Sequence, residues 1–204
     1  ALFQISFCRG LQRNQPEKIS TLEKLLAGFP ESEYYDDALY ELGRAYERTG
    51  KSSEGTAQYE NLIQNYPQSN YYRKALLQLG LINFNNGDFN KSLSQYKQVA
   101  EKYAGTPEAR AALSGIKNCY VELNNIDAYF AYTQKLGTGV NVTVSEQDSL
   151  TYMAAERVYM SGDEHAAVQL QQYIQRYPNG SFVLNANFYL AELLYKEGEY
   201  EKAN

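Results

Sequence analysis

The chain has little of several residue types that carry chemistry. Among 204 residues there is no tryptophan, one histidine and two cysteines. The histidine, His165, has no cysteine nearby and cannot give the ligand spacing of a zinc site. No Gly-x-Ser-x-Gly motif or Cys/His arrangement supplies an oriented nucleophile. We therefore expect no enzyme activity, no metal site and no cofactor, and we interpret His165 as a surface or capping residue on a helix.

The two cysteines are too few and too far apart in sequence for a disulfide framework. We expect both Cys8 and Cys119 to be small buried apolar groups. Their small number leaves the redox compartment open.

Basic residues and long apolar runs are also scarce. Lys and Arg number 19 against 24 Asp and Glu, a formal net charge of −5, and no basic cluster of the kind typical of nucleic-acid binding is present. No stretch approaches the roughly 18 apolar residues that a transmembrane helix needs. Residues 1–8 lack the features of a cleaved leader, so we expect a helix there. Because no initiating methionine is present, we expect a mature or excised part of a longer protein.

What the sequence does have is a repeat. Residues 29–32 (Phe-Pro-Glu-Ser) are matched by residues 66–69 (Tyr-Pro-Gln-Ser), at an offset of 37. Further pairs at this offset are Ala38-Leu39 with Ala75-Leu76, Leu42-Gly43 with Leu79-Gly80, Gly50 with Gly87, and Tyr59 with Tyr96. With small slips the pattern continues to Tyr177-Pro178 and Gly198. Self-similarity at such a period is typical of a helical repeat array.

Each unit is predicted to be a pair of helices. In residues 38–46 the apolar side chains recur with the spacing of one helix face. Gly50 is placed to end this helix, because glycine takes the left-handed conformation without a Cβ clash. A second amphipathic run over 59–66 is ended by Pro67, which has no N–H group.

Small residues are predicted to let neighbouring helices approach closely. They stand at Ala38, Gly43, Ala75 and Gly80, and the large Tyr and Leu residues would fill the opposing hollows. This packing accounts for most of the 20 tyrosines, because a phenol can bury its ring and keep its hydroxyl bonded.

These motifs resemble the tetratricopeptide repeat (TPR) pattern. Leu39-x2-Leu42-Gly43-x2-Tyr46 followed by Tyr59 and Pro67 carries the resemblance, while Gly55 and Asn83 depart from it. The resemblance implies an all-α, right-handed superhelical solenoid of antiparallel helix pairs. The aromatic-Pro-x-Ser linkers look like those of bacterial cell-envelope TPR proteins, such as the Tol–Pal coordinator and outer-membrane assembly lipoproteins. That likeness implies a periplasmic or outer-membrane-associated protein, with a cytoplasmic location left open.

We predict a single array over residues 1–204 with about five and a half repeats of roughly 37 residues. The predicted repeats are 1–33, 34–70, 71–107, 108–144, 145–181 and a truncated 182–204. Residues 137–144 are rich in glycine and β-branched residues, and we expect an extended loop there. The last repeat would leave an apolar face bare, so we expect a continuing chain or self-association through this open C-terminal repeat.

The family resemblance places one helix of each repeat along a concave groove. The groove-facing positions are Tyr40, Arg44, Glu47, Leu77, Leu81, Phe84, Asn118, Tyr152, Glu156, Tyr159, Phe188, Glu192 and Tyr195. Aromatic side chains beside charges suit a bound protein segment, although some of these rings could instead pack between repeats. We expect a protein-binding scaffold or adaptor in the cell envelope. The alternative is an oligomerisation or spacer segment of a larger protein, with no peptide groove of its own.

Overall fold

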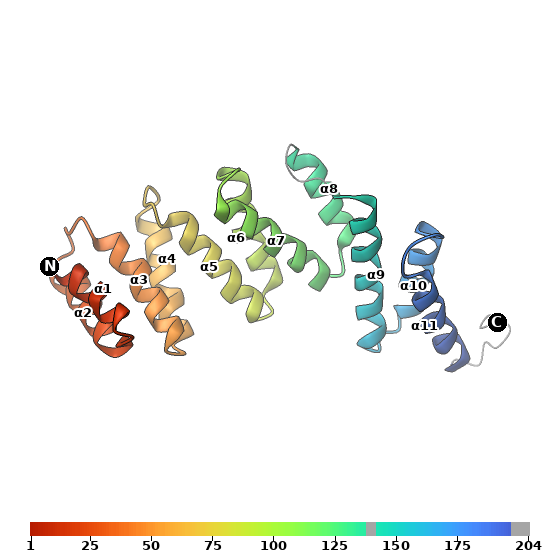
Figure 1. The fold of residues 1–204 in the computed structure, drawn as a ribbon, viewed down its shortest axis with the longest axis horizontal. Helices are drawn as coiled ribbons and strands as arrows, with labels where there is room; N and C mark the ends of the chain where they lie inside the picture. Colours follow the sequence, from red (N-terminus) through yellow and green to blue (C-terminus); the bar gives the residue numbers. More distant parts are fainter. Residues whose placement is uncertain (138–141, 197–204) are drawn as a thin grey trace. The chain divides into compact units, whose positions relative to one another are not determined.

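The computed structural model describes residues 1–137 and 142–196, and these residues form eleven α-helices and no strand. The helices are α1 Leu2–Leu11, α2 Gln15–Gly28, α3 Tyr35–Arg48, α4 Ser52–Asn65, α5 Tyr72–Asn85, α6 Phe89–Lys102, α7 Pro107–Glu122, α8 Ile126–Leu136, α9 Val144–Met160, α10 Ala166–Arg176 and α11 Val183–Lys196. Consecutive helices are joined by short turns and run back and forth as pairs (Figure 1). The predicted all-α solenoid of helix pairs is confirmed.

The chain divides into two compact units, Ala1–Ile116 and Lys117–Asn204. The first unit holds α1 to α6, and the division falls inside α7. Both units are built from the same helix pair. The pairs α1–α2, α3–α4 and α5–α6 lie within residues 1–33, 34–70 and 71–107, while α7 and α9 each begin one residue before the predicted starts at 108 and 145.

Glycine and proline set the ends of the helices, as expected. The helix α3 ends at Arg48, and Gly50 follows with a φ of +78°. Asn124, at the place of Gly50 in repeat four, takes a φ of +49°, which asparagine tolerates better than most side chains. The helix α4 ends at Asn65, two residues before Pro67.

The predicted loop over 137–144 lies partly outside the described residues. Gly137 follows α8 with a φ of +75°. The expectation that Val144 belongs to the loop is wrong, because α9 begins there. The reason is a helix cap: the hydroxyl of Thr143 accepts a hydrogen bond from the amide of Glu146 at 3.1 Å.

Tyrosine rings pack directly against glycines within the repeats. A Cβ atom added to Gly43 would lie 2.6 Å from the Tyr59 ring, and one added to Gly80 would lie 2.5 Å from the Tyr96 ring. The opposite edge of Tyr96 fills the space beside Gly115 on α7. The prediction that small residues admit large rings is therefore confirmed, and any side chain at these glycines would displace a buried ring.

The interface between α2 and α3 encloses a buried cation. Lys18 is buried beside the apolar cluster that Leu22 and Leu42 help to form, and its ammonium group pairs with Glu41. The other carboxylate oxygen of Glu41 accepts a hydrogen bond from Arg44 at 3.2 Å. The pairing matters because an unpaired buried charge is strongly destabilising.

The two cysteines differ in exposure. Cys119 is buried, as predicted, whereas Cys8 is exposed, so the prediction is wrong for Cys8. At the offset of 37, Cys8 corresponds to Ala45 on the face of α3 that packs in a cluster with α2. Among the described residues no helix packs on this face of α1 in the way that α2 packs on α3. This face of α1 is therefore open.

Candidate functional site

The predicted groove positions all lie on the first helices of their repeats. Those on α3 and α5 belong to the first unit, and those on α7, α9 and α11 belong to the second.

Two of the predicted groove tyrosines are buried. Tyr40 stacks on Tyr71 with 4.7 Å between ring centroids, and Tyr152 stacks on Phe182 at 4.5 Å. These rings pack between one repeat and the next. The offset of 37 relates the first stack to a third, in which Phe3 lies 5.2 Å from Tyr34. Tyr40 and Tyr152 therefore pack between repeats, which is the alternative to groove binding for these two rings.

Two groove glutamates are held by tyrosine hydroxyls. Tyr59 donates to Glu47 at 2.8 Å, and Tyr152 donates to Glu156 at 2.6 Å. Burial first, and then these hydrogen bonds, raise the pKa of both tyrosines, so the hydroxyls stay protonated donors. Both carboxylates remain partly exposed and fixed in position.

The helix α5 carries an apolar strip. Leu81 is 46% exposed, Leu77 and Phe84 are partly exposed, and Phe84 meets Phe89 edge to face at 5.3 Å. These three residues recur at the spacing of one helix face.

The junction between repeats three and four has no counterpart of the stack of Tyr40 on Tyr71. At the offset of 37, Leu77 takes the place of Tyr40, and Glu108 takes the place of Tyr71. The carboxylate of Glu108 lies 3.3 Å from the Nε atom of Arg73. A leucine and a charged residue thus stand where two stacked rings would otherwise be.

The preceding repeat has a cation at the position equivalent to Leu81. Arg44, at the place of Leu81, is partly exposed, and its guanidinium carbon lies 5.8 Å from the centre of the Tyr40 ring. Its guanidinium group donates one hydrogen bond to Glu41, and a guanidinium has five N–H donors. Arg44 can therefore bind a further acceptor while it stays in place.

The groove positions of the second unit combine rings with charges. Tyr159 stacks on Tyr189 at 4.3 Å and donates to Glu192 at 2.7 Å. Lys196 donates to the same carboxylate at 2.6 Å, and these two bonds, that of Lys196 first, lower the pKa of Glu192. Phe188 is 65% exposed. The remaining positions, Asn118 and Tyr195, are also exposed.

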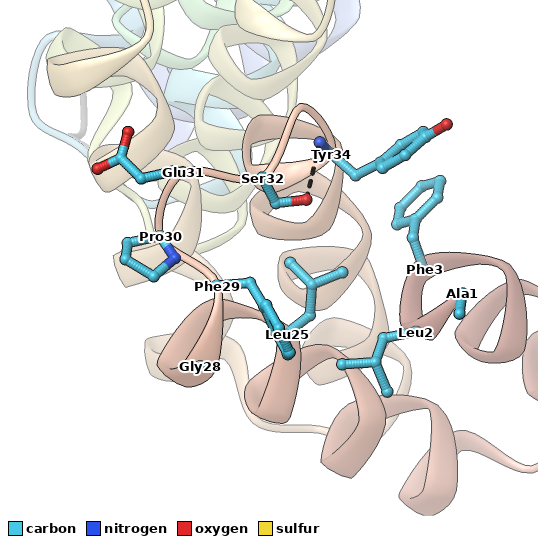
Figure 2. Close-up of a pocket in the computed structure, with 10 residues that line it drawn as sticks. All are labelled: Ala1, Leu2, Phe3, Leu25, Gly28, Phe29, Pro30, Glu31, Ser32 and Tyr34. Atoms are coloured by element: carbon cyan, nitrogen blue, oxygen red, sulfur yellow. Dashed lines mark hydrogen bonds between the residues drawn. The ribbon is translucent and has the colours of Figure 1, made fainter.

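Sequence reasoning did not find an apolar hollow of about 530 Å³ in the first repeat. Its lining includes Leu2, Phe3, Leu25, Phe29 and Tyr34 (Figure 2). The turn over it is held by the amide of Tyr34, which donates to the Ser32 hydroxyl at 3.3 Å.

The repeat explains this hollow. Leu2, the first residue of α1, corresponds to Leu39 in α3, but α3 begins at Tyr35. Tyr35 packs on Tyr66 at 5.6 Å, and Tyr66 is the counterpart of Phe29. The hollow is therefore the place beside Phe29 that a helix turn fills in repeat two.

His165 is exposed at the N-cap position of α10 rather than inside the helix, and it bonds to Asp163. The described residues hold no group of three or more histidine, cysteine or acidic side chains placed to bind a metal ion. Across the ranges 1–137 and 142–196, no helix is long and apolar enough to cross a bilayer.

Comparison with known proteins supports the repeat family. The family model for the tetratricopeptide repeat matches residues 37–69 and 74–106, which cover all but the first two residues of the helix pairs of repeats two and three. A search of curated protein sequences finds no match.

Solved structures share the fold at low sequence identity. A tetratricopeptide repeat protein from Parabacteroides merdae superposes with a TM-score of 0.60 at 17% identity, covering 99% of this chain and 74% of that one. The PilF protein of Pseudomonas aeruginosa gives 0.52 at 14% identity, with 99% and 85% covered. A putative kinesin light chain with TPR-like repeats from Podospora anserina gives 0.52 at 15% identity, with 88% and 96% covered. These likenesses establish the TPR-like helical fold.

Proposed function

We propose that this chain is a TPR scaffold or adaptor of the bacterial cell envelope, which binds a protein segment along the first helices of repeats two and three. Proteins with tetratricopeptide repeats generally act by binding other proteins. The observation that carries the proposal is the apolar strip of α5, with Leu81 half exposed, together with the partly exposed cation Arg44 at the equivalent position of α3. An apolar side chain of the partner would cover Leu77 and Leu81, and Arg44 would bind a carboxylate or a main-chain carbonyl.

The place in the cell envelope rests on the linker sequences. The turns over residues 29–34, 66–71 and 177–182 share an aromatic-Pro opening, a serine and an aromatic residue before the next helix. This is the linker style of the envelope TPR proteins that the sequence resembles. Fractionation of cells that naturally make the whole protein, followed with an antibody raised against this chain, tests this part. The protein is expected in the periplasm or with the outer membrane, and recovery with the cytoplasm alone would contradict the proposed location.

Partner capture tests the binding face. The immobilised chain is exposed to a bacterial envelope extract beside the variant Leu81→Asp, which places a charge on the apolar strip. The variant Leu11→Asp is the matched control, because Leu11 is an exposed leucine that belongs to α1 and not to α3 or α5. We expect one protein to be retained by the wild type and the control and lost by Leu81→Asp.

The same proteins bound to all three chains, or none bound to any, would contradict binding at this face. Circular dichroism of the variants must first show unchanged helix content. Alanine at Tyr40 is a poor choice for this test, since the buried ring stabilises the fold and its removal would change folding as well as binding.

A further inference from the structure

Both methionines of the chain, Met153 and Met160, are exposed on α9. The side chain of Met153 is 50% exposed, and that of Met160 is 65% exposed. The two residues lie two helical turns apart, so they share one side of α9. Methionine is often used to fill gaps in a protein core, and neither residue has that place here.

The positions of the two methionines hold polar residues in the first unit. The comparison allows for the slip of one residue that pairs Tyr152 with Tyr40. The counterparts on α3 and α5 are Glu41, Arg48, Gln78 and Asn85. The repeat therefore does not need an apolar side chain at either position, and it accepts a polar one.

The face of α9 between the two methionines is open, although the same face is buried in the three preceding repeats. Arg157 stands at the place of Ala45, Ile82 and Cys119, and all three of these residues are buried. The side chain of Arg157 is 42% exposed. Because α9 lies between α8 and α10 within the array, this exposure does not arise at an end of the chain. A small reagent dissolved in water can therefore reach this face.

Arg157 is a neighbour of both methionines on the helix. It follows Met153 by four residues and precedes Met160 by three, and such pairs have Cβ atoms about 5–6 Å apart. Its guanidinium group donates a hydrogen bond to Glu122, which leaves further N–H groups for other acceptors. The two thioethers thus lie beside a group that can donate hydrogen bonds to an oxygen atom placed on either sulfur.

We propose that Met153 and Met160 form a reversible oxidation site that reacts with hydrogen peroxide. The thioether sulfur attacks one oxygen of the peroxide, so that an S–O bond forms while the O–O bond breaks. The sulfur loses two electrons to the peroxide. The transferred oxygen gives up its proton, the leaving hydroxide takes up a proton, and water is released. The product is methionine sulfoxide, which methionine sulfoxide reductases convert back.

The oxidised chain keeps its fold. A sulfoxide is polar, and polar side chains occupy the corresponding positions of α3 and α5. An N–H group of Arg157 can donate to the new oxygen atoms, and water reaches both positions. The site is separate from the apolar strip of α5, so a failure of the binding proposal leaves the oxidation proposal standing.

Peptide mass spectrometry during peroxide treatment tests the reactivity. The chain carries Cys8→Ser, because peroxide would also oxidise this exposed thiol. Both methionines are expected to gain one oxygen atom at rates within several-fold of that of N-acetylmethionine amide in the same solution.

A buried methionine on the same helix is the matched control. Leu150 is only 6% exposed, and Leu150→Met is made in a chain that also carries Met153→Leu and Met160→Leu. The exchange of leucine for methionine conserves volume and should keep the fold. The new methionine is expected to react at least about tenfold more slowly than the native pair, because oxidation follows exposure.

Circular dichroism and urea denaturation test the fate of the oxidised chain. The fully oxidised chain is expected to keep the helix content and the urea midpoint of the reduced chain. Treatment with reductases for both sulfoxide epimers and a thiol reductant is expected to restore both thioethers.

The protein in cells that naturally make it provides the last test. Sulfoxide at both residues is expected to rise after a pulse of hydrogen peroxide and to fall during recovery. Three results would overturn the proposal. They are native methionines that react as slowly as Leu150→Met, an oxidised chain that loses helix content or is not restored by the reductases, and no sulfoxide at these residues in peroxide-treated cells.

Discussion

A tyrosine ring lying on a glycine is the contact that links the repeat sequence to its packing. Tyr59 lies on Gly43, and Tyr96 lies between Gly80 and Gly115. The rings are buried, and the hydroxyl of Tyr59 reaches Glu47 at the edge of the packed layer. This arrangement explains why tyrosine suits these positions, because a phenol can bury its ring and keep its hydroxyl hydrogen-bonded.

Replacing one of these glycines should therefore destabilise the fold. We expect Gly80→Ala to lower the free energy of unfolding by about 1–3 kcal/mol, because the new methyl group overlaps the Tyr96 ring. Urea denaturation measures the change. Gly28→Ala is the control, since nothing lies within 4 Å of its Cβ position, and it should leave stability unchanged or slightly raised. Equal stability of Gly80→Ala and wild type would contradict the packing described for Tyr96.

His165 gives a second test at the residue scale. Its Nδ1 atom lies 2.8 Å from a carboxylate oxygen of Asp163, and this hydrogen bond raises the pKa of His165 above the ordinary 6.5. The favourable pairing is thus fully present below pH 6.5 and is lost as the pH rises through the raised pKa. NMR titration of the ring protons of this histidine should give a midpoint above 6.5 that falls in Asp163→Asn. An identical midpoint in both proteins would show that the carboxylate has no influence.

The sequence predicted some single residues well and others poorly, for a physical reason. Gly50 and Pro67 act on their own backbone, so their effect is visible locally. Helix periodicity alone cannot show that Tyr40 is covered, because its partner Tyr71 comes from the next repeat. The exposure of Cys8 likewise depends on a neighbouring helix and not on the residue itself.

At the scale of elements, the stability of each helix pair depends on its interface with the neighbouring pair. The interface between α2 and α3 contains the buried ion pair of Lys18 and Glu41 among apolar residues. The existence and order of the helices followed from the apolar spacing and the turn residues. The start of α9 did not, because the Thr143 cap outweighed the β-branched residues that favoured a loop.

The ion pair of Lys18 and Glu41 between α2 and α3 can be tested by substitution. We expect Glu41→Gln to destabilise the chain by about 3–5 kcal/mol, because it leaves the Lys18 ammonium buried without its counter-charge. Replacing both residues in Lys18→Met with Glu41→Leu should recover most of the loss. Urea denaturation of the single and double variants measures both effects. A Glu41→Gln variant as stable as wild type would mean that the ion pair does not stabilise the interface between α2 and α3.

At the scale of the whole molecule, the two units use the same helix pair with different surfaces. In the first unit the junction after repeat two has stacked rings, while the next has Leu77 and Glu108 in their places. In the second unit the stacked rings recur at Tyr152 and Phe182, and α9 exposes two methionines where repeats two and three have polar residues. The repeat thus builds the scaffold, and departures from it create the exposed surfaces that we propose as sites of binding and of oxidation.

Hydrogen–deuterium exchange of the full chain, alone and with the protein captured from envelope extract, tests the binding claim most directly. Helices protected by a partner exchange more slowly, and each peptide of the chain reports its own region. We expect slowed exchange in α5 over Tyr72–Asn85 and in α3 over Tyr35–Arg48. Protection confined to the second helices α4 and α6, or to the second unit, would contradict binding along the first helices of repeats two and three.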